Sequence, residues 1–222
     1  MPFFGAVHLF AARRTFAAAS TLAGLAALAA LFLLHPIDGV MAQGAAAAPV
    51  AKPVSLPDMA LGPAKAPVAI VEYASMSCPH CAGFELNVFP MLKSKYIDTG
   101  KVRFVFREFP LDVKAVAASM LARCIAGDDA GKYFGAVEAL FKAQDQLMEH
   151  TTDTLKLIGK QLAGMSEEAV ETCVKDQAML DKLKADQKYA FETLKVDATP
   201  TFFVNGEKLR GAMSFVRALL KR

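Results

Sequence analysis

The sequence predicts an α/β domain in which a small sheet is interrupted by a long helical block. A short, mostly apolar run at 68–74 is typical of a buried strand. Helical periodicity then dominates for about 85 residues, over about 112–196. Strand character returns at 201–210, where Asn205-Gly206 is the strongest short signal for a two-residue hairpin turn. We find no internal repeat.

Composition restricts the class of protein. The chain has 222 residues, with 25 basic and 22 acidic side chains and a net charge of +3. Apolar residues are concentrated in the first 42 residues, and the remainder has globular composition and enough length to bury a core. Because the charge is nearly balanced and no Lys/Arg stripe with aromatic residues is present, nucleic acid is not expected as a partner.

The first 42 residues predict export. Arg13 and Arg14 precede an uncharged run over 15–34, and small residues end at Ala42. We interpret 1–42 as a secretory signal peptide. Since the run is about 20 residues long, an uncleaved membrane anchor is the alternative, and the arginine pair also resembles a twin-arginine export signal. Either route places the protein in an oxidising compartment.

The elements before the helical block are predicted from local patterns. The Ala- and Pro-rich residues 43–67 predict a flexible leader. After the first strand, Pro79 suits the first position of a helix, and Pro90 is expected to kink that helix. A second strand is predicted over 102–106, which is β-branched and aromatic. The apolar face of the intervening helix has helical spacing: Phe84, Val88, Met91 and Leu92.

The helical block divides into several amphipathic helices. Ser166, followed by Glu167 and Glu168, predicts a helix start, through an N-cap and two acids in the first turn. A further helix over about 213–220 is expected to close the domain. The apolar stripes are interpreted as core without chemistry; those of the first and last helices of the block include Val113, Val116, Ala117, Met120, Leu121, Cys124, Ile125, Leu180, Leu183, Ala190, Phe191 and Leu194.

The candidate site is Cys78-Pro79-His80-Cys81, at the predicted junction of strand and helix. The N–H groups and partial positive charge of a helix N-terminus face the first sulfur, and a protonated His80 adds a second cationic influence. We therefore expect the pKa of Cys78 to fall from ~8.5 toward ~3.5–7.5. Cys81, one helical turn later, lies within disulfide reach. Because a stabilised thiolate stabilises the reduced pair, the disulfide becomes a stronger oxidant.

Two other interpretations of the motif are a zinc site and an inert structural disulfide. Zinc would need a second cluster of ligands. The histidines outside the motif are His8, His35 and His150, and the first two lie in the predicted signal peptide. We therefore expect no metal.

The residues around this motif resemble the DsbA family of periplasmic oxidoreductases. Val-Glu-Tyr-Ala-Ser-Met-Ser-Cys-Pro-His-Cys at 71–81, the helical block, Thr199-Pro200 and the Asn-Gly hairpin occur in the order of that family. The resemblance covers 68–222 and is close to alphaproteobacterial DsbA-like members. It implies a thioredoxin fold with an all-helical cap inserted, at about 112–196, between the second strand and a cis-proline hairpin.

The resemblance also implies a role for each residue near the motif. Cys78 would be the nucleophilic cysteine that forms mixed disulfides, and Cys81 the resolving cysteine. Pro79 and His80 would tune the redox potential. Glu72, six residues before Cys78, corresponds to a partly buried acid of the family that exchanges a proton with Cys81; exposure at a sheet edge is the alternative explanation of its place in an apolar strand.

Two further pairs of residues complete the prediction: Thr199 and Pro200 at the site, and Cys124 and Cys173 in the helical block. Pro200 resembles the cis-proline that faces the active site, and Thr199 would offer backbone groups to a substrate strand. Enteric oxidases of the family carry Val where this chain has Thr199, a residue also found in isomerase-type relatives. Cys124 and Cys173 are either buried free thiols or a structural disulfide. The even cysteine count favours the disulfide, and a second, non-catalytic one also occurs in alphaproteobacterial relatives.

The implied activity is enzymatic thiol–disulfide exchange, introducing disulfides into exported proteins in the periplasm. It needs no cofactor beyond the redox-active pair Cys78–Cys81. The expected partners are reduced or misfolded exported proteins and a membrane oxidase of the DsbB type. The first alternative is a periplasmic isomerase or reductase of the same fold, kept reduced by another membrane partner. A copper-binding module that uses the dithiol as ligand is the second.

Overall fold

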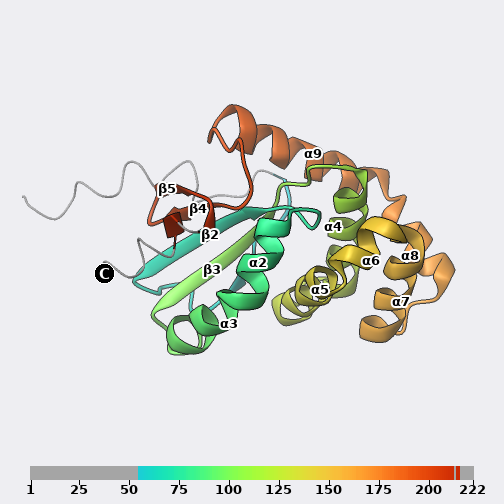
Figure 1. Ribbon diagram of the computed structural model, residues 1–222, viewed down its shortest axis with the longest axis horizontal. Coiled ribbons are helices and arrows are strands. Elements are labelled where there is room, and N and C mark those ends of the chain that lie inside the picture. The colour runs from blue at the N-terminus through green and yellow to red at the C-terminus, as the bar shows by residue number, and fades with distance from the viewer. Residues whose placement is uncertain (1–54, 213, 216–222) are drawn as a thin grey trace, which may run out of the picture. The chain divides into compact units, whose positions relative to one another are not determined.

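The protein folds around one mixed sheet (Figure 1). A computed structural model describes residues 55–212, 214 and 215. In this part of the chain the strand order is β1-β3-β2-β4-β5; β2 and β3 are parallel, and the other neighbouring pairs are antiparallel. The strands are β1 (Met59–Leu61), β2 (Val68–Ala74), β3 (Val102–Glu108), β4 (Thr201–Val204) and β5 (Glu207–Arg210).

The helices fall into two groups. Three short ones connect β2 to β3, and the block expected over about 112–196 lies between β3 and β4. Figure 1 shows α4 to α8 gathered beside α2, whereas α9 leads back toward β4. The connecting helices are α2 (Pro79–Asn87), α3 (Phe89–Leu92) and the π-helix η2 (Lys93–Ile97). The block consists of α4 (Val113–Ala126), α5 (Ala130–Lys142), α6 (Gln144–Glu149), α7 (Thr151–Ala163), α8 (Glu167–Val174) and α9 (Gln177–Glu192).

Strands β2, β3 and β4 are buried on both faces of the sheet, and the alternation of side chains along them separates two cores. Glu72 lies between Ile70 and Ala74 on β2, so alternation directs its side chain to the face covered by α2. The core on that face includes Ile70, Ala74, Phe84, Phe89, Phe104, Phe106, Phe134 and Phe202. The core on the opposite face, against the end of α9, includes Val71, Tyr73, Val105, Ala190, Leu194, Val196 and Phe203.

The predicted hairpin turn and the predicted start of α8 are both found in the structure. Asn205 and Gly206 have φ of 49° and 88°, in the region that a tight hairpin turn requires, and they join β4 to β5. The Ser166 side chain accepts a hydrogen bond from the N–H of Ala169 at 3.1 Å, and α8 begins at Glu167 as expected. These two predictions are confirmed.

Other predictions about helix faces are wrong. Pro90 does not kink one long helix. The helix ends at Asn87, and Pro90 lies in the first turn of α3, where its missing N–H removes no intrahelical hydrogen bond. Met91, Val113 and Phe191 are 39%, 78% and 57% exposed, so they are not core residues.

Within the predicted leader, residues 59–61 form strand β1 of the sheet, and residues 56–58 before it are held by hydrogen bonds. Met59 and Leu61 pair with Phe106 and Phe104 as β1 runs antiparallel to β3. Met59 is buried, since only 3% of it is exposed. The prediction of a flexible leader is therefore wrong for residues 56–61, because β1 covers the edge of β3 and pairs its backbone groups.

Several predictions fall outside the described residues. These are the signal peptide at 1–42, the part of the leader at 43–54 and, except for residues 214 and 215, the closing helix at 213–220. Among the described helices, none combines the length and apolar character needed to cross a bilayer.

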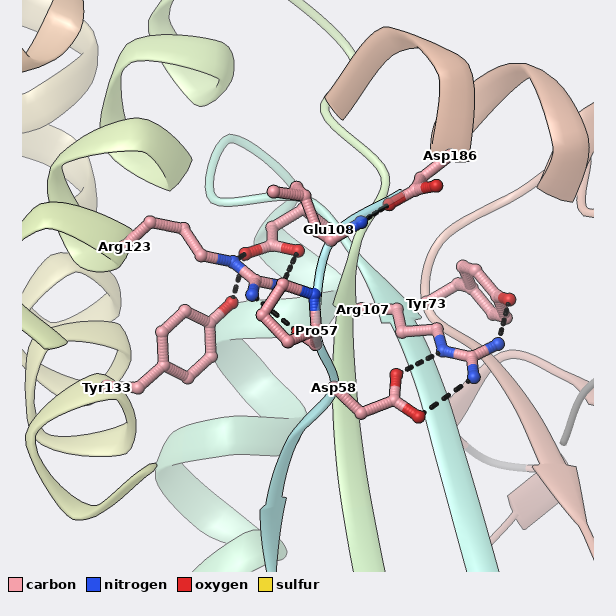
Figure 2. A network of polar contacts seen from close by, with 9 residues as sticks. Pro57, Asp58, Tyr73, Arg107, Glu108, Arg123, Tyr133 and Asp186 are labelled. Atoms are coloured by element: carbon pink, nitrogen blue, oxygen red, sulfur yellow. Dashed lines mark hydrogen bonds and ion pairs between the residues drawn. The ribbon is translucent and has the colours of Figure 1, made fainter. Parts of the chain in front are cut away.

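A buried ion pair joins the helical block to the sheet (Figure 2). The Arg123 guanidinium of α4 contacts both carboxylate oxygens of Glu108, at the end of β3, at 2.6 and 2.7 Å. Tyr133 of α5 donates its hydroxyl to the same carboxylate at 2.5 Å. Arg123 also donates to the carbonyl of Pro57, 2.6 Å away, so one guanidinium holds α4, β3 and the segment before β1 together.

A second ion pair fastens the same N-terminal segment. Arg107 donates to both carboxylate oxygens of Asp58, at 2.8 and 3.1 Å, and to the Tyr73 hydroxyl at 2.7 Å (Figure 2). Asp186 of α9 accepts a hydrogen bond from the backbone N–H of Leu56 at 2.8 Å. Residues 56–58 are thereby attached to the sheet and to two helices of the block.

Candidate functional site

The cysteine pair lies where β2 passes into α2. Cys78 is the N-cap residue, with an extended backbone, and Pro79 begins the helix with φ already fixed. The backbone N–H groups of Cys81 and Ala82 both donate to the carbonyl of Cys78 at 3.1 Å. Both cysteines are buried: Cys78 is 5% exposed, and Cys81 is not exposed at all.

The environment of Cys78 stabilises its thiolate. A hydrogen bond from the Cys81 thiol is the largest cause, and together with Thr199 and the backbone N–H groups of Cys81 and His80 it lowers the pKa of Cys78 to about 5, against the opposing effect of burial. The Thr199 hydroxyl is buried and has no hydrogen-bond partner among the described residues. This hydroxyl is therefore free to donate a hydrogen bond to Cys78 when Cys78 is a thiolate. Backbone N–H groups at the helix N-terminus, including that of His80, therefore contribute as expected.

Cys81 is held in the opposite state. Burial, the adjoining Cys78 and the nearby Glu72 all raise its pKa far above the ordinary value, so the thiol keeps its proton. Glu72 is 1% exposed, and its Oε2 atom has no hydrogen-bond partner among the described residues. Burial, followed by repulsion from Glu85 and Cys78, raises the pKa of Glu72 as well. A proton-holding acid thus lies near the buried thiol, on the sheet face under α2.

The second part of the site comes from the end of the helical block. The Thr199–Pro200 peptide is cis. The Sγ atom of Cys78 lies 3.3 Å from the Thr199 carbonyl oxygen, to which the thiol donates, across 121 residues of sequence. Beside this contact is an open pocket of about 460 Å³. Its lining includes Pro79, His80, Phe84, Thr199, Pro200 and Arg210. The fold therefore brings Cys78, Cys81, Pro79, His80, Glu72, Thr199 and Pro200 into one region.

Sequence reasoning missed one residue of this region, Gln144. Its side-chain amide, at the start of α6, donates to the carbonyls of Met76 and Cys78 at 2.8 and 3.1 Å. Gln144 thus fastens the cysteine loop to the helical block. No local pattern indicated it, because its partners lie 66 and 68 residues earlier in the sequence.

The second cysteine pair lies within the helical block. Cys124 of α4 and Cys173 of α8 form a disulfide that spans 49 residues of sequence. Among residues 55–212, 214 and 215, no group of three or more His, Cys, Asp or Glu side chains is arranged to hold a metal ion.

Comparison with known proteins agrees with this geometry. A family model described as thioredoxin matches residues 55–219. A Rickettsia bellii protein named as a protein-disulfide oxidoreductase is 37% identical over 151 residues, which are 67% of this chain and 57% of that protein. The chain therefore spans just over half the length of this curated relative. A Bacillus cereus protein named "Probable disulfide bond formation protein D" is 29% identical over 154 residues, which are 66% of this chain and 69% of that protein.

A solved structure extends the comparison to the fold. The crystal structure of Wolbachia pipientis alpha-DsbA1 superposes with a TM-score of 0.64 at 34% identity, covering 75% of this chain and 91% of that chain. The thioredoxin fold with an inserted helical cap is therefore confirmed. The chain belongs to the thioredoxin family and, within it, to the DsbA-like protein-disulfide oxidoreductases.

Proposed function

We propose that the protein is a thiol:disulfide oxidoreductase that introduces disulfide bonds into exported proteins, using Cys78 and Cys81 alone as its redox group. One observation carries this proposal: the two sulfurs are held in opposite states, because Cys78 is stabilised as a thiolate and Cys81 as a thiol. A stable Cys78 thiolate is a good leaving group and favours the reduced pair, so the oxidised pair readily accepts electrons from a client.

The exchange proceeds in two displacements. A client thiolate attacks Sγ of Cys78 in the oxidised enzyme, and a client–Cys78 disulfide forms as the Cys78–Cys81 bond breaks. The buried Cys81 thiolate that leaves takes a proton from Glu72, which the surrounding apolar core keeps protonated. A second client thiolate then attacks the client sulfur of the mixed disulfide and releases the Cys78 thiolate. The client loses two electrons and the enzyme pair gains them.

The surroundings of the pair suggest how a client is held. Thr199 places its backbone next to Cys78 and would pair with an extended client segment. Pro79, His80 and Pro200 line the adjoining pocket, which is open to solvent and would receive client side chains. By their resemblance to the family, Pro79 and His80 would tune the potential of the pair, and Pro200 would face it.

The partners follow from the chemistry and from the first 42 residues. These residues would direct the chain to the periplasm, as a cleaved signal or as an anchor. Since each catalytic cycle leaves Cys78 and Cys81 reduced, a membrane oxidase of the DsbB type, linked to quinones, would restore the disulfide. The Cys124–Cys173 disulfide would stabilise the helical block and take no part in exchange.

The alternative is an isomerase or reductase of the same fold, which would work with the pair reduced. Thr199 favours it, since isomerase-type relatives also carry Thr before the proline. The reduction potential distinguishes the two, measured in glutathione buffers on the full chain and on the Cys124→Ala/Cys173→Ala variant. A value near the −120 mV of strong oxidants supports the oxidase. A value near the −270 mV of thioredoxins contradicts it.

A further inference from the structure

A second pocket lies between the α2–η2 segment and α5. Its volume is about 470 Å³, within the usual range for small-molecule sites, and it shares no lining residue with the pocket beside Cys78. The inner wall is apolar: Phe89 and Phe134 stack with ring centroids 5.9 Å apart and planes 6° apart, and Leu61 of β1 lies beside them.

One carboxyl that lines the pocket has no hydrogen-bond partner among the described residues. Glu85 of α2 is 3% exposed, and no hydrogen bond reaches its Oε2 atom from the described residues. Burial, with the added repulsion of Glu138, raises the pKa of Glu85 to about 8. A buried carboxyl without a partner is costly, and most such groups in proteins are paired. The unpaired oxygen therefore calls for a hydrogen-bond donor that the protein does not supply.

The opposite wall is kept open by glycine. Gly131 and Gly135 line the pocket one helical turn apart on α5. A Cβ at Gly135 would meet no atom within 4 Å, so close packing does not require glycine there. Glycine inside a helix costs about 1 kcal/mol relative to alanine. The missing side chain instead leaves free space above the pocket.

The charges around the pocket indicate the kind of donor. At its mouth, Lys142 and Lys93 are already paired with Glu138 and Asp98 at 2.5 and 2.7 Å. The charged groups coupled to Glu85 from behind the pocket wall are Glu72 and Tyr133, and both are acids rather than cations. Among the described residues, no basic group is paired with Glu85. A cation attached to an apolar body complements this arrangement.

We propose that the pocket binds a small primary amine, with its ammonium group on Glu85 and its apolar body against Phe89 and Phe134. This site is separate from the proposed exchange at Cys78. Because neutral Glu85 must ionise to pair with an ammonium group that is already charged, the carboxyl proton leaves to solvent. Binding at pH 7 should therefore release close to one proton per amine, and affinity should rise about tenfold from pH 6 to pH 7.

The test is calorimetric titration of the full chain with 2-phenylethylamine, in buffers of different ionisation enthalpy. We expect 1:1 binding with proton release, and at least tenfold weaker binding of 2-phenylethanol, which has the same ring without the charge. Glu85→Gln should weaken amine binding at least tenfold, while Glu149→Gln, an exposed acid on α6, should leave it unchanged. Gly135→Met should block the pocket with Glu85 intact, and circular dichroism verifies that each variant is folded.

Several outcomes would overturn the proposal. One is the absence of saturable binding between pH 6 and pH 8, which would indicate that the pocket holds only water. Equal affinity for the alcohol and the amine, or unchanged binding by Glu85→Gln or Gly135→Met, would show that the ammonium–Glu85 contact does not form. Tighter binding of Nα-acetyl-lysine amide than of 2-phenylethylamine would assign the pocket to lysine side chains of other proteins. Activity at Cys78 is not a readout of this experiment, so its failure leaves the proposed function untouched.

Discussion

Glu85→Gln should stabilise the protein, and the gain should depend on pH. The folded state holds the Glu85 proton until about pH 8, whereas an unfolded chain releases it near pH 4.5, so the native acid costs stability as pH rises between these values. Each pH unit in that interval is worth about 1.4 kcal/mol. Replacement by the neutral amide should therefore have no titration effect at pH 4, gain about 3 kcal/mol at pH 7 and approach about 5 kcal/mol above pH 8.

Urea denaturation of the full chain and the variant at pH 4, 5.5, 7 and 8.5 measures this difference. A change in packing caused by the amide would alter the free energy of unfolding by the same amount at every pH. The diagnostic quantity is therefore the slope of the stability difference between the variant and the native protein against pH. Glu149→Gln is the matched control, because that acid is exposed and should give a flat difference. A difference for Glu85→Gln that stays constant, or that shrinks toward pH 7, would refute the reasoning. Glu72 and Glu138, which also face this carboxyl, would then set its charge differently.

Three further predictions concern the cysteines and their loop. The thiolate absorbance of the reduced protein should show that Cys78 titrates near pH 5. Because this pKa is lower than that of an unfolded cysteine, the reduced form should lose stability relative to the oxidised form as the pH falls from 9 to 5. A titration midpoint near pH 9 would contradict this prediction. Cys124→Ala/Cys173→Ala should lower the free energy of unfolding by about 4 kcal/mol, the entropy of a 49-residue loop, and equal urea midpoints would oppose it. Gln144→Ala should cost about 2 kcal/mol for two lost hydrogen bonds, while the exposed Gln146→Ala should cost nothing measurable.

The elements that could be predicted from the sequence are those specified by residues close to one another along the chain. Asn205-Gly206 specifies its turn through backbone conformation, and Ser166 caps α8 through its own side chain. The cysteine motif is likewise contiguous, so its place before a helix could be inferred from the neighbouring strand and Pro79.

Features that depend on distant contacts were not predictable. Strand β1 is three residues long and exists because it pairs with β3, more than 40 residues later. Glu85 lies in an ordinary helical segment, and only the packing of α5 against α2 makes it a buried acid. Val113 and Phe191 fit apolar stripes but extend beyond the helix contacts and are exposed. For Thr199, only the resemblance to a family indicated a place beside Cys78.

The distance in sequence between Cys78 and Thr199 has a consequence for the order of synthesis. The first cysteine is made 121 residues before the carbonyl that contacts it, and the whole helical block separates them. Until the chain has been completed as far as β4, Cys78 lacks its contact with Thr199, whereas the groups of His80 and Cys81 that also lower its pKa lie within three residues of it in the sequence. The pocket beside Cys78, which Thr199 and Pro200 help to line, is therefore completed only when the chain has been made as far as these residues.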